Sequence, residues 1–93
     1  MSELEMVVAE KIGQIIPDYE KLDVRANIGD TTYSVEFFAT INGKKMQCYD
    51  MVDDGLIAEK ELDVTIKSIA EYIRTSAEYA VGTINKFSFS IIK

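Results

Sequence analysis

Histidine is absent from this chain, and with it the commonest general base and the commonest metal ligand of proteins. Cysteine occurs once, at position 48, so no disulfide forms within the chain and a reducing compartment is expected. No apolar run approaches the roughly 18 residues that a membrane-spanning helix needs. The opening segment MSELEMVVAEK is acidic and lacks the basic region of a secretory signal. We therefore expect a cytoplasmic protein that does not enter a membrane.

The motifs that phosphate-binding and nucleophilic enzymes use are also missing. The chain contains neither GxGxxG nor GxxxxGK[ST], so no loop is shaped to hold a phosphate. Cys48 falls on the core side of a predicted strand and has no histidine to activate it, so we interpret it as a small apolar residue. Asp53 and Asp54 are adjacent carboxylates, but such pairs on surface turns are usually solvated. We expect no enzymatic activity, no catalytic residue, no metal and no cofactor.

Basic residues are few, with 10 Lys and Arg against 16 Asp and Glu and a net charge of −6. A negative surface repels phosphate backbones, which argues against nucleic acid as a partner. It attracts cationic proteins and raises the rate at which they are encountered. Net charges of about this size are also ordinary in small domains, where they simply maintain solubility. The charge therefore excludes one class of partner more firmly than it identifies another.

The 93 residues suffice for a single domain, 1–93, and its organising segment is residues 33–51, YSVEFFATINGKKMQCYDM. Asn42-Gly43 between two alternating apolar runs predicts a β-hairpin with a type I′ turn. The two-residue turn fixes the register and makes one face core. The other face is polar but carries three large side chains, from Phe38, Tyr49 and Met51. Such a cluster among charges resembles the apolar centre of an interface with a polar rim.

The segments before the hairpin predict a helix and a strand. Residues 3–16 place apolar side chains at helical spacing, with a capping box from Ser2 and Glu5 at the start and Pro17 at the end. Residues 20–28 alternate between apolar and polar side chains, as expected for a strand with one face exposed to solvent.

The segments after the hairpin predict a second helix and a fourth strand. The helix covers about residues 58–80, with Gly82 as its C-cap, and the strand covers residues 86–92. Because an unpaired edge is an aggregation hazard, this strand must pair with the other three. The predicted fold is α+β in the order α-β-β-β-α-β, a two-layer domain in which both helices cover one face of an antiparallel four-stranded sheet.

The acidic connection after the hairpin partly matches a calcium-binding loop. Five positions match the twelve-residue pattern, namely 1, 5, 6, 8 and 12, which are Asp50, Asp54, Gly55, Ile57 and Glu61. Position 3 is Val52, which has no oxygen in its side chain, and the preceding segment is predicted as a strand rather than a helix. Two other interpretations are a turn before an acidic helix start and a negative surface that meets a basic partner.

Residues 9–28, AEKIGQIIPDYEKLDVRANI, resemble the start of the YezG-like antitoxin and immunity family. The matching pattern is a helix ending in Ile16-Pro17, then Asp18, an aromatic at Tyr19, Glu-Lys and a strand. The later order of hairpin, acidic connection, long helix and NKFSFSI strand is also similar. The resemblance implies a bacterial protein, of a contact-dependent growth inhibition or polymorphic-toxin system, that binds and blocks a toxin, often a nuclease. It implies no catalytic residue.

Two functions follow as hypotheses. The first is an immunity protein that neutralises a cognate toxin, with a basic nuclease domain as the expected partner, by occluding its active site; the alternative is an acidic secretion-type chaperone, a homodimer that binds an effector client. A homodimer is possible under either. The residues expected to contact the partner are Asp50, Asp53, Asp54, Glu59, Glu61, Phe38, Tyr49 and Met51.

Overall fold

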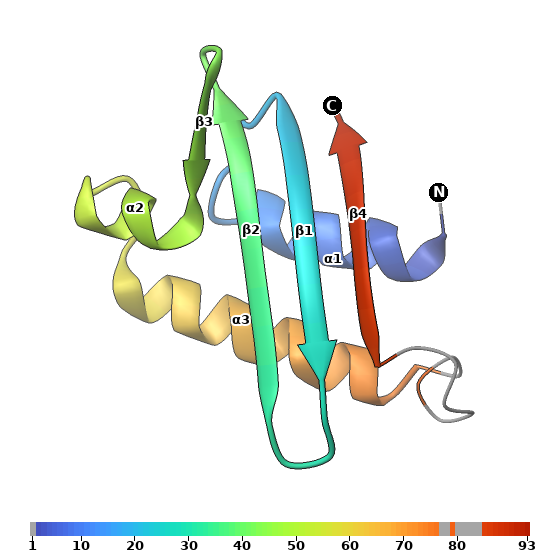
Figure 1. The fold of residues 1–93 in the computed structure, drawn as a ribbon. Helices are drawn as coiled ribbons and strands as arrows, with labels where there is room; N and C mark the ends of the chain where they lie inside the picture. The colour runs from blue at the N-terminus through green and yellow to red at the C-terminus, as the bar shows by residue number, and fades with distance from the viewer. Residues whose placement is uncertain (1, 77–78, 80–84) are drawn as a thin grey trace.

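Four antiparallel strands form one sheet, and the two longer helices lie behind one face of it (Figure 1). The computed structural model describes residues 2–76, 79 and 85–93. The α+β class, the antiparallel sheet and the single helical face are confirmed. In chain order the elements are α1 (Glu3–Gly13), β1 (Lys21–Ile28), β2 (Tyr33–Ile41), β3 (Lys44–Gln47), α2 (Cys48–Asp53), α3 (Glu59–Arg74) and β4 (Lys86–Ile92).

The strand order is β3-β2-β1-β4, so β1 is a central strand and β4 joins the meander beside it. Leu22, Val24 and Ala26 of β1 are buried against the helices, as their alternation predicts. Val24 lies opposite Phe37 of β2 on one side and Phe89 of β4 on the other. The core therefore forms between this face of the sheet and the two helices.

The hairpin turn has the predicted geometry. Asn42 and Gly43 both have positive φ, 52° and 78°, as a type I′ turn requires. Ala39 pairs with Met46 and Ile41 with Lys44, which confirms the register next to the turn.

Beyond Gln47 the prediction of a continuing strand is wrong. β3 has four residues, and the chain then forms α2, a short third helix that the predicted element order lacks. The pairs expected further from the turn therefore do not form as strand pairs.

α1 begins with the predicted capping box, in which Ser2 Oγ accepts from the Glu5 amide while Glu5 Oε1 accepts from the Ser2 amide. The helix ends at Gly13, three residues before the predicted end, and the amides of Ile15 and Ile16 still donate to the Ile12 carbonyl. A hydrogen bond of 2.8 Å from Lys11 Nζ to Ser68 Oγ joins α1 to α3.

α3 carries the predicted apolar stripe, with Leu62, Ile66, Ile69 and Ile73 buried. It ends at Arg74, whose guanidinium donates to the carbonyls of the β1–β2 turn at Gly29 and Thr32. The predicted C-cap, Gly82, lies outside the described residues. Among the helices that the structure describes, none is long and apolar enough to cross a membrane.

Candidate partner-binding surface

The five acidic residues predicted to contact a partner lie on α2 and the start of α3. Asp50 and Asp53 belong to α2, and Asp54 is its C-cap. Glu59 and Glu61 are in the first turn of α3. All five are exposed to solvent, so the structure presents them on two consecutive elements.

Two of the three large side chains predicted for the outer sheet face are elsewhere. Met51 is 0% exposed and belongs to the core, whereas Tyr49 is 50% exposed on α2. Cys48 and Met51 are three residues apart, a spacing that puts both on one face of a helix but on opposite faces of a strand. A helix therefore buries both side chains, and this burial of apolar surface favours a helix over a strand at these residues. The predicted cluster with Phe38 is therefore wrong, and Met51 is not available to a partner.

The end of α2 has a specific backbone geometry. Gly55 has a φ of +77°, and its amide donates to Val52 while the Leu56 amide donates to Met51. These two bonds form a Schellman motif, which ends a helix with a left-handed residue that is usually glycine. The calcium-loop interpretation fails because its first four positions, residues 50–53, lie in α2 and are helical.

A groove lies between β2, α2 and α3. Its volume is about 440 Å³, and it is lined by Tyr33, Tyr49, Asp63, Val64, Ile66 and Lys67. Val64 is 60% exposed and Tyr33 42% exposed. Burial raises the pKa of the Tyr49 hydroxyl, and the nearby carboxylates of Asp63 and Glu36 add to this effect. The groove therefore combines exposed apolar surface with one acidic and one basic side chain, Asp63 and Lys67.

Sequence reasoning did not identify Tyr33 and Val64 as surface residues of this groove. One signal was available for Val64, because it falls outside the apolar stripe of α3 that Leu62 and Ile66 define. An apolar side chain on the polar face of a helix is a candidate for contact with another molecule. The sequence offers no comparable signal for Tyr33. Its exposure depends on how α2 and α3 pack beside β2, which the sequence does not show.

The edge of β2 is open beside this groove. β3 pairs only with residues 38–41 of β2, whereas β1 pairs along residues 33–40. The Gly29 amide donates to the Thr32 carbonyl, and hydrogen-bonded pairs recur at every second residue of an antiparallel ladder. The even-numbered residues of β2 therefore form hydrogen bonds with β1. The odd-numbered Tyr33 and Val35 direct their backbone amides and carbonyls away from β1. Within the described part of the chain no strand pairs with this stretch of edge.

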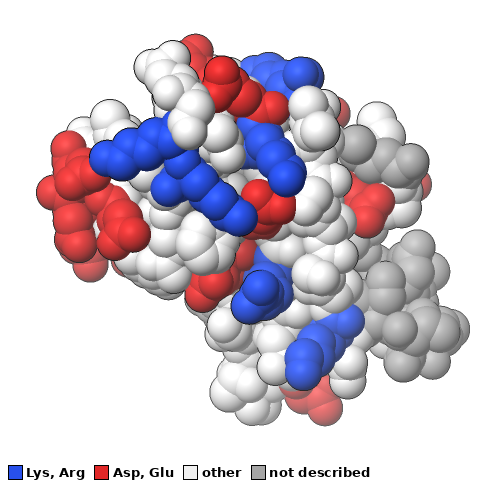
Figure 2. All heavy atoms as spheres, turned by 45° about the horizontal axis from the view of Figure 1, so that its top comes forward, with Lys and Arg blue, Asp and Glu red and all other residues white. Residues whose placement is uncertain are grey.

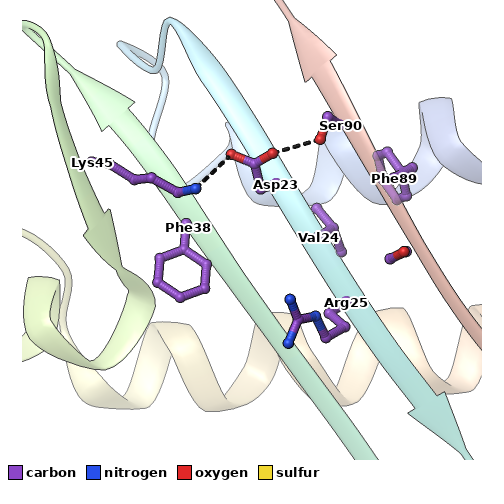
Figure 3. A pocket seen from close by; sticks show the side chains of 8 residues that line it. Asp23, Val24, Arg25, Phe38, Lys45, Phe89 and Ser90 are labelled. Atoms are coloured by element: carbon purple, nitrogen blue, oxygen red, sulfur yellow. Dashed lines mark hydrogen bonds and ion pairs between the residues drawn. The ribbon is translucent and has the colours of Figure 1, made fainter.

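The outer face of the sheet has a carboxylate at its centre (Figure 3). Asp23 accepts a hydrogen bond from Ser90 Oγ and lies 3.6 Å from Lys45 Nζ and 3.9 Å from Lys21 Nζ. The Ser90 hydrogen bond, with help from both lysines, holds the pKa of Asp23 below its ordinary value, although burial acts in the opposite direction. The surrounding hollow has a volume of about 230 Å³.

Phe38 is the one predicted contact residue that does lie on this outer face. It is half-buried, stands opposite Asp23 and Gln47, and has Lys45 Nζ 5.2 Å from its ring centre. The strand registers place Lys21, Arg25, Lys45 and Lys86 on this face with Asp23 and Glu36. Cations outnumber carboxylates there, so this face suits a basic partner less well than the acidic residues of α2 and α3 do.

The two kinds of charge meet at the hairpin end of the molecule. A hollow of about 320 Å³ is lined by Lys44 and Lys45 of β3 together with Asp50, Asp53 and Asp54. Figure 2 shows acidic side chains grouped at the left edge beside lysines, with further Lys and Arg side chains over the middle of the view. The sequence analysis treated the acidic residues of α2 and α3 and the residues of the outer sheet face as one contact surface. The structure places them on two adjoining surfaces of unlike charge.

Cys48 is fully buried at the start of α2, and burial raises the pKa of its thiol. A buried thiol with a raised pKa is a poor nucleophile. Among the described residues, no three His, Cys, Asp or Glu side chains are grouped closely enough to hold a metal ion.

Comparison with known proteins adds no relative, since no family model and no curated protein matches the chain.

Proposed function

We propose that this chain is an immunity-type inhibitor that binds a basic toxin domain, of which a nuclease is the best example, and occludes its active site. The observation that carries the proposal is the position of exposed apolar side chains within the acidic segment. Tyr49, Leu56 and Val64 are each at least half exposed, and they alternate with the acidic residues of α2 and α3.

Physical chemistry connects this surface to that partner. A nuclease holds a polyanion, so the face around its active site is basic, and an acidic inhibitor complements it. Charge speeds the encounter, while buried aromatic and aliphatic anchors slow dissociation. The carboxylates of Asp50, Asp53 and Asp54 supply the first effect, and Tyr49 and Val64 supply the second.

The groove beside β2 offers a concave site for part of the toxin. A projecting loop of the toxin would place an apolar side chain between Tyr33, Tyr49 and Val64, with Asp63 and Lys67 at the rim. A toxin held in this way would have its basic face covered by α2 and the start of α3.

The test is neutralisation of a basic nuclease domain encoded beside the gene of this chain. We expect the wild-type chain to abolish nuclease activity at equimolar concentration and to restore growth of cells that express the domain. The triple variant Tyr49→Ala, Asp53→Lys, Asp54→Lys changes only exposed residues. It should bind at least about 100-fold more weakly, because it removes one apolar anchor and reverses two charges.

Arg25→Glu is the matched control, since Arg25 is exposed on the outer sheet face, away from α2. It should neutralise the nuclease like the wild type. Full neutralisation by the triple variant would remove the acidic surface from the proposal. Equal loss in the triple variant and in the control would show that the contact lies on another face.

A further inference from the structure

The two edges of the sheet are built differently. β3 forms one edge with four residues, and two of them are Lys44 and Lys45. Short edge strands and lysine side chains prevent pairing with other chains. β4 forms the other edge with seven residues, KFSFSII, and has no charge or proline after Lys86. One edge is thus protected, and the other is not.

The inward side chains of β4 are incompletely covered. Phe87, Phe89 and Ile91 are only partly buried, whereas the facing residues of β1 are fully buried. Ile92 is 78% exposed at the end of the strand. A strand with this pattern gains apolar burial when another strand adds beside it.

The helical layer also leaves apolar surface exposed at this edge of the sheet. The N-terminal turn of α1 extends past β4 in Figure 1, and Met6 in this helix is 49% exposed. A largely apolar groove of about 420 Å³ lies between α1 and β4, lined in part by Met6, Ala9 and Ile91. The exposed apolar surface therefore continues from the strand onto the helix.

The backbone of β4 has hydrogen-bonding groups that point outward. The Ile28 amide donates to the Asn85 carbonyl, and the Lys93 amide donates to the Glu20 carbonyl. These two bonds show that odd-numbered residues of β4 bond to β1. Lys86, Ser88, Ser90 and Ile92 therefore direct their amides and carbonyls off the edge, and no strand of the described residues pairs with them.

We propose that β4 pairs antiparallel with β4 of a second copy of this chain, which joins two four-stranded sheets into one. The strand is self-complementary, because phenylalanine and isoleucine alternate with serine about its centre at Phe89. In the antiparallel arrangement Phe87, Phe89 and Ile91 of both copies lie on the helical side, and the serines lie on the other side together with Ile92.

A second copy fits this edge for reasons of charge. Each chain carries a net charge of −6, but the only charged residue of β4 is Lys86 at its start. Within the strand itself, the middle of the seam would therefore contain no like charges. The acidic residues of α2 and of the start of α3 lie toward the opposite edge of the sheet and need not approach those of the second copy (Figure 1). The groove beside β2 is at the opposite edge of each sheet and remains exposed, so the dimer is compatible with inhibitor and chaperone functions alike.

The test is the mass of the protein in solution, measured by light scattering at several concentrations. We expect the wild-type chain at about 100 μM to have twice the monomer mass of 10.5 kDa. Ser88→Pro removes an outward amide, which an edge strand tolerates, and should raise the dimer dissociation constant at least about tenfold. Ser88→Thr keeps the amide and is the matched control, expected to remain dimeric.

A second variant guards against misfolding. Ser88→Lys changes an exposed side chain and leaves the backbone intact, yet it puts lysines of both copies beside the seam, where their repulsion should also weaken the dimer. Circular dichroism checks that each variant is folded. A wild-type chain that is monomeric at 100 μM overturns the proposal, and so does a folded Ser88→Pro or Ser88→Lys variant that stays fully dimeric.

Discussion

At the scale of single residues, Asp23 shows how a polar sheet face is held together. Its carboxylate takes a hydrogen bond from Ser90 on β4 and ion pairs from Lys45 on β3 and Lys21 on its own strand. These partners lie on three strands, so one side chain connects most of the width of the sheet. Hydrogen bonds to a charged group are stronger than neutral ones, which makes this contact worth testing.

Ser90→Ala should lower the free energy of unfolding by about 1 kcal/mol at pH 7, because it removes the donor that most lowers the pKa of Asp23. A carboxyl with a depressed pKa stabilises the fold above its unfolded pKa, and this contribution disappears as pH falls through the folded pKa. The difference between wild type and variant, measured by urea unfolding, should therefore be constant from pH 5 to 8 and shrink below about pH 4.

The control for this measurement is Ser88→Ala, the neighbouring outward-facing serine of β4. It should change stability by less than about 0.5 kcal/mol at every pH. If the Ser90→Ala difference were the same at pH 3 as at pH 7, the hydrogen bond to a charged Asp23 would not be its cause.

At the scale of elements, α2 is the feature that changes where the candidate contact residues lie. It occupies the place where the hairpin strand was predicted to continue. As a result Tyr49 projects beside the groove, Met51 enters the core, and the edge of β2 stays open at Tyr33 and Val35.

Met51→Ala should destabilise the protein by about 2–5 kcal/mol, because it leaves a cavity at a fully buried position. Tyr49→Ala, two residues earlier in the same helix, should cost less than about 1 kcal/mol because its side chain is half exposed. Thermal or urea unfolding of both variants measures the contrast. Equal and small effects would instead fit a continued strand with Met51 on the exposed face.

Most elements could be predicted from the sequence because their signals are local. The Asn42-Gly43 turn, the capping box at Ser2 and Glu5, and the alternation of β1 each depend on neighbouring residues only. α2 was not predicted, because alternation and helical spacing are hard to separate over six residues. Its signal was the joint burial of Cys48 and Met51, which becomes visible only once the core is known.

At the scale of the whole molecule, charge is distributed unevenly. Carboxylates concentrate on α2 and the start of α3, whereas the outer sheet face carries more cations than carboxylates. The net charge of −6 predicted an acidic molecule but not this separation, since the sequence does not show which residues share a surface. The sequence therefore identified acidic and large apolar residues as candidates for contact, but it placed only some of them on the correct surface.

Under the proposed function, association with a basic nuclease domain should slow at least about tenfold between 25 and 300 mM salt, because screening weakens attraction to the local acidic surface. Stopped-flow measurement should show a much smaller change in the dissociation rate. Arg25→Glu also makes the net charge more negative, but on the sheet face, and should change the association rate less than about twofold. Arg25→Glu changes the net charge by two units and Asp53→Lys with Asp54→Lys by four, so an increase with half the logarithm of the decrease would mean that net charge, not its location, controls the encounter.

The position of β4 beside β1 also has a consequence for biosynthesis. β1 is complete at residue 28, and β2 follows directly to cover one of its sides, but its other neighbour begins at residue 86. At about 5–20 residues per second, a ribosome needs several seconds to make the intervening segment. Throughout that interval the apolar strand at the centre of the future sheet has one open side in the nascent chain, which makes it the segment where a chaperone acting during translation would have most to protect.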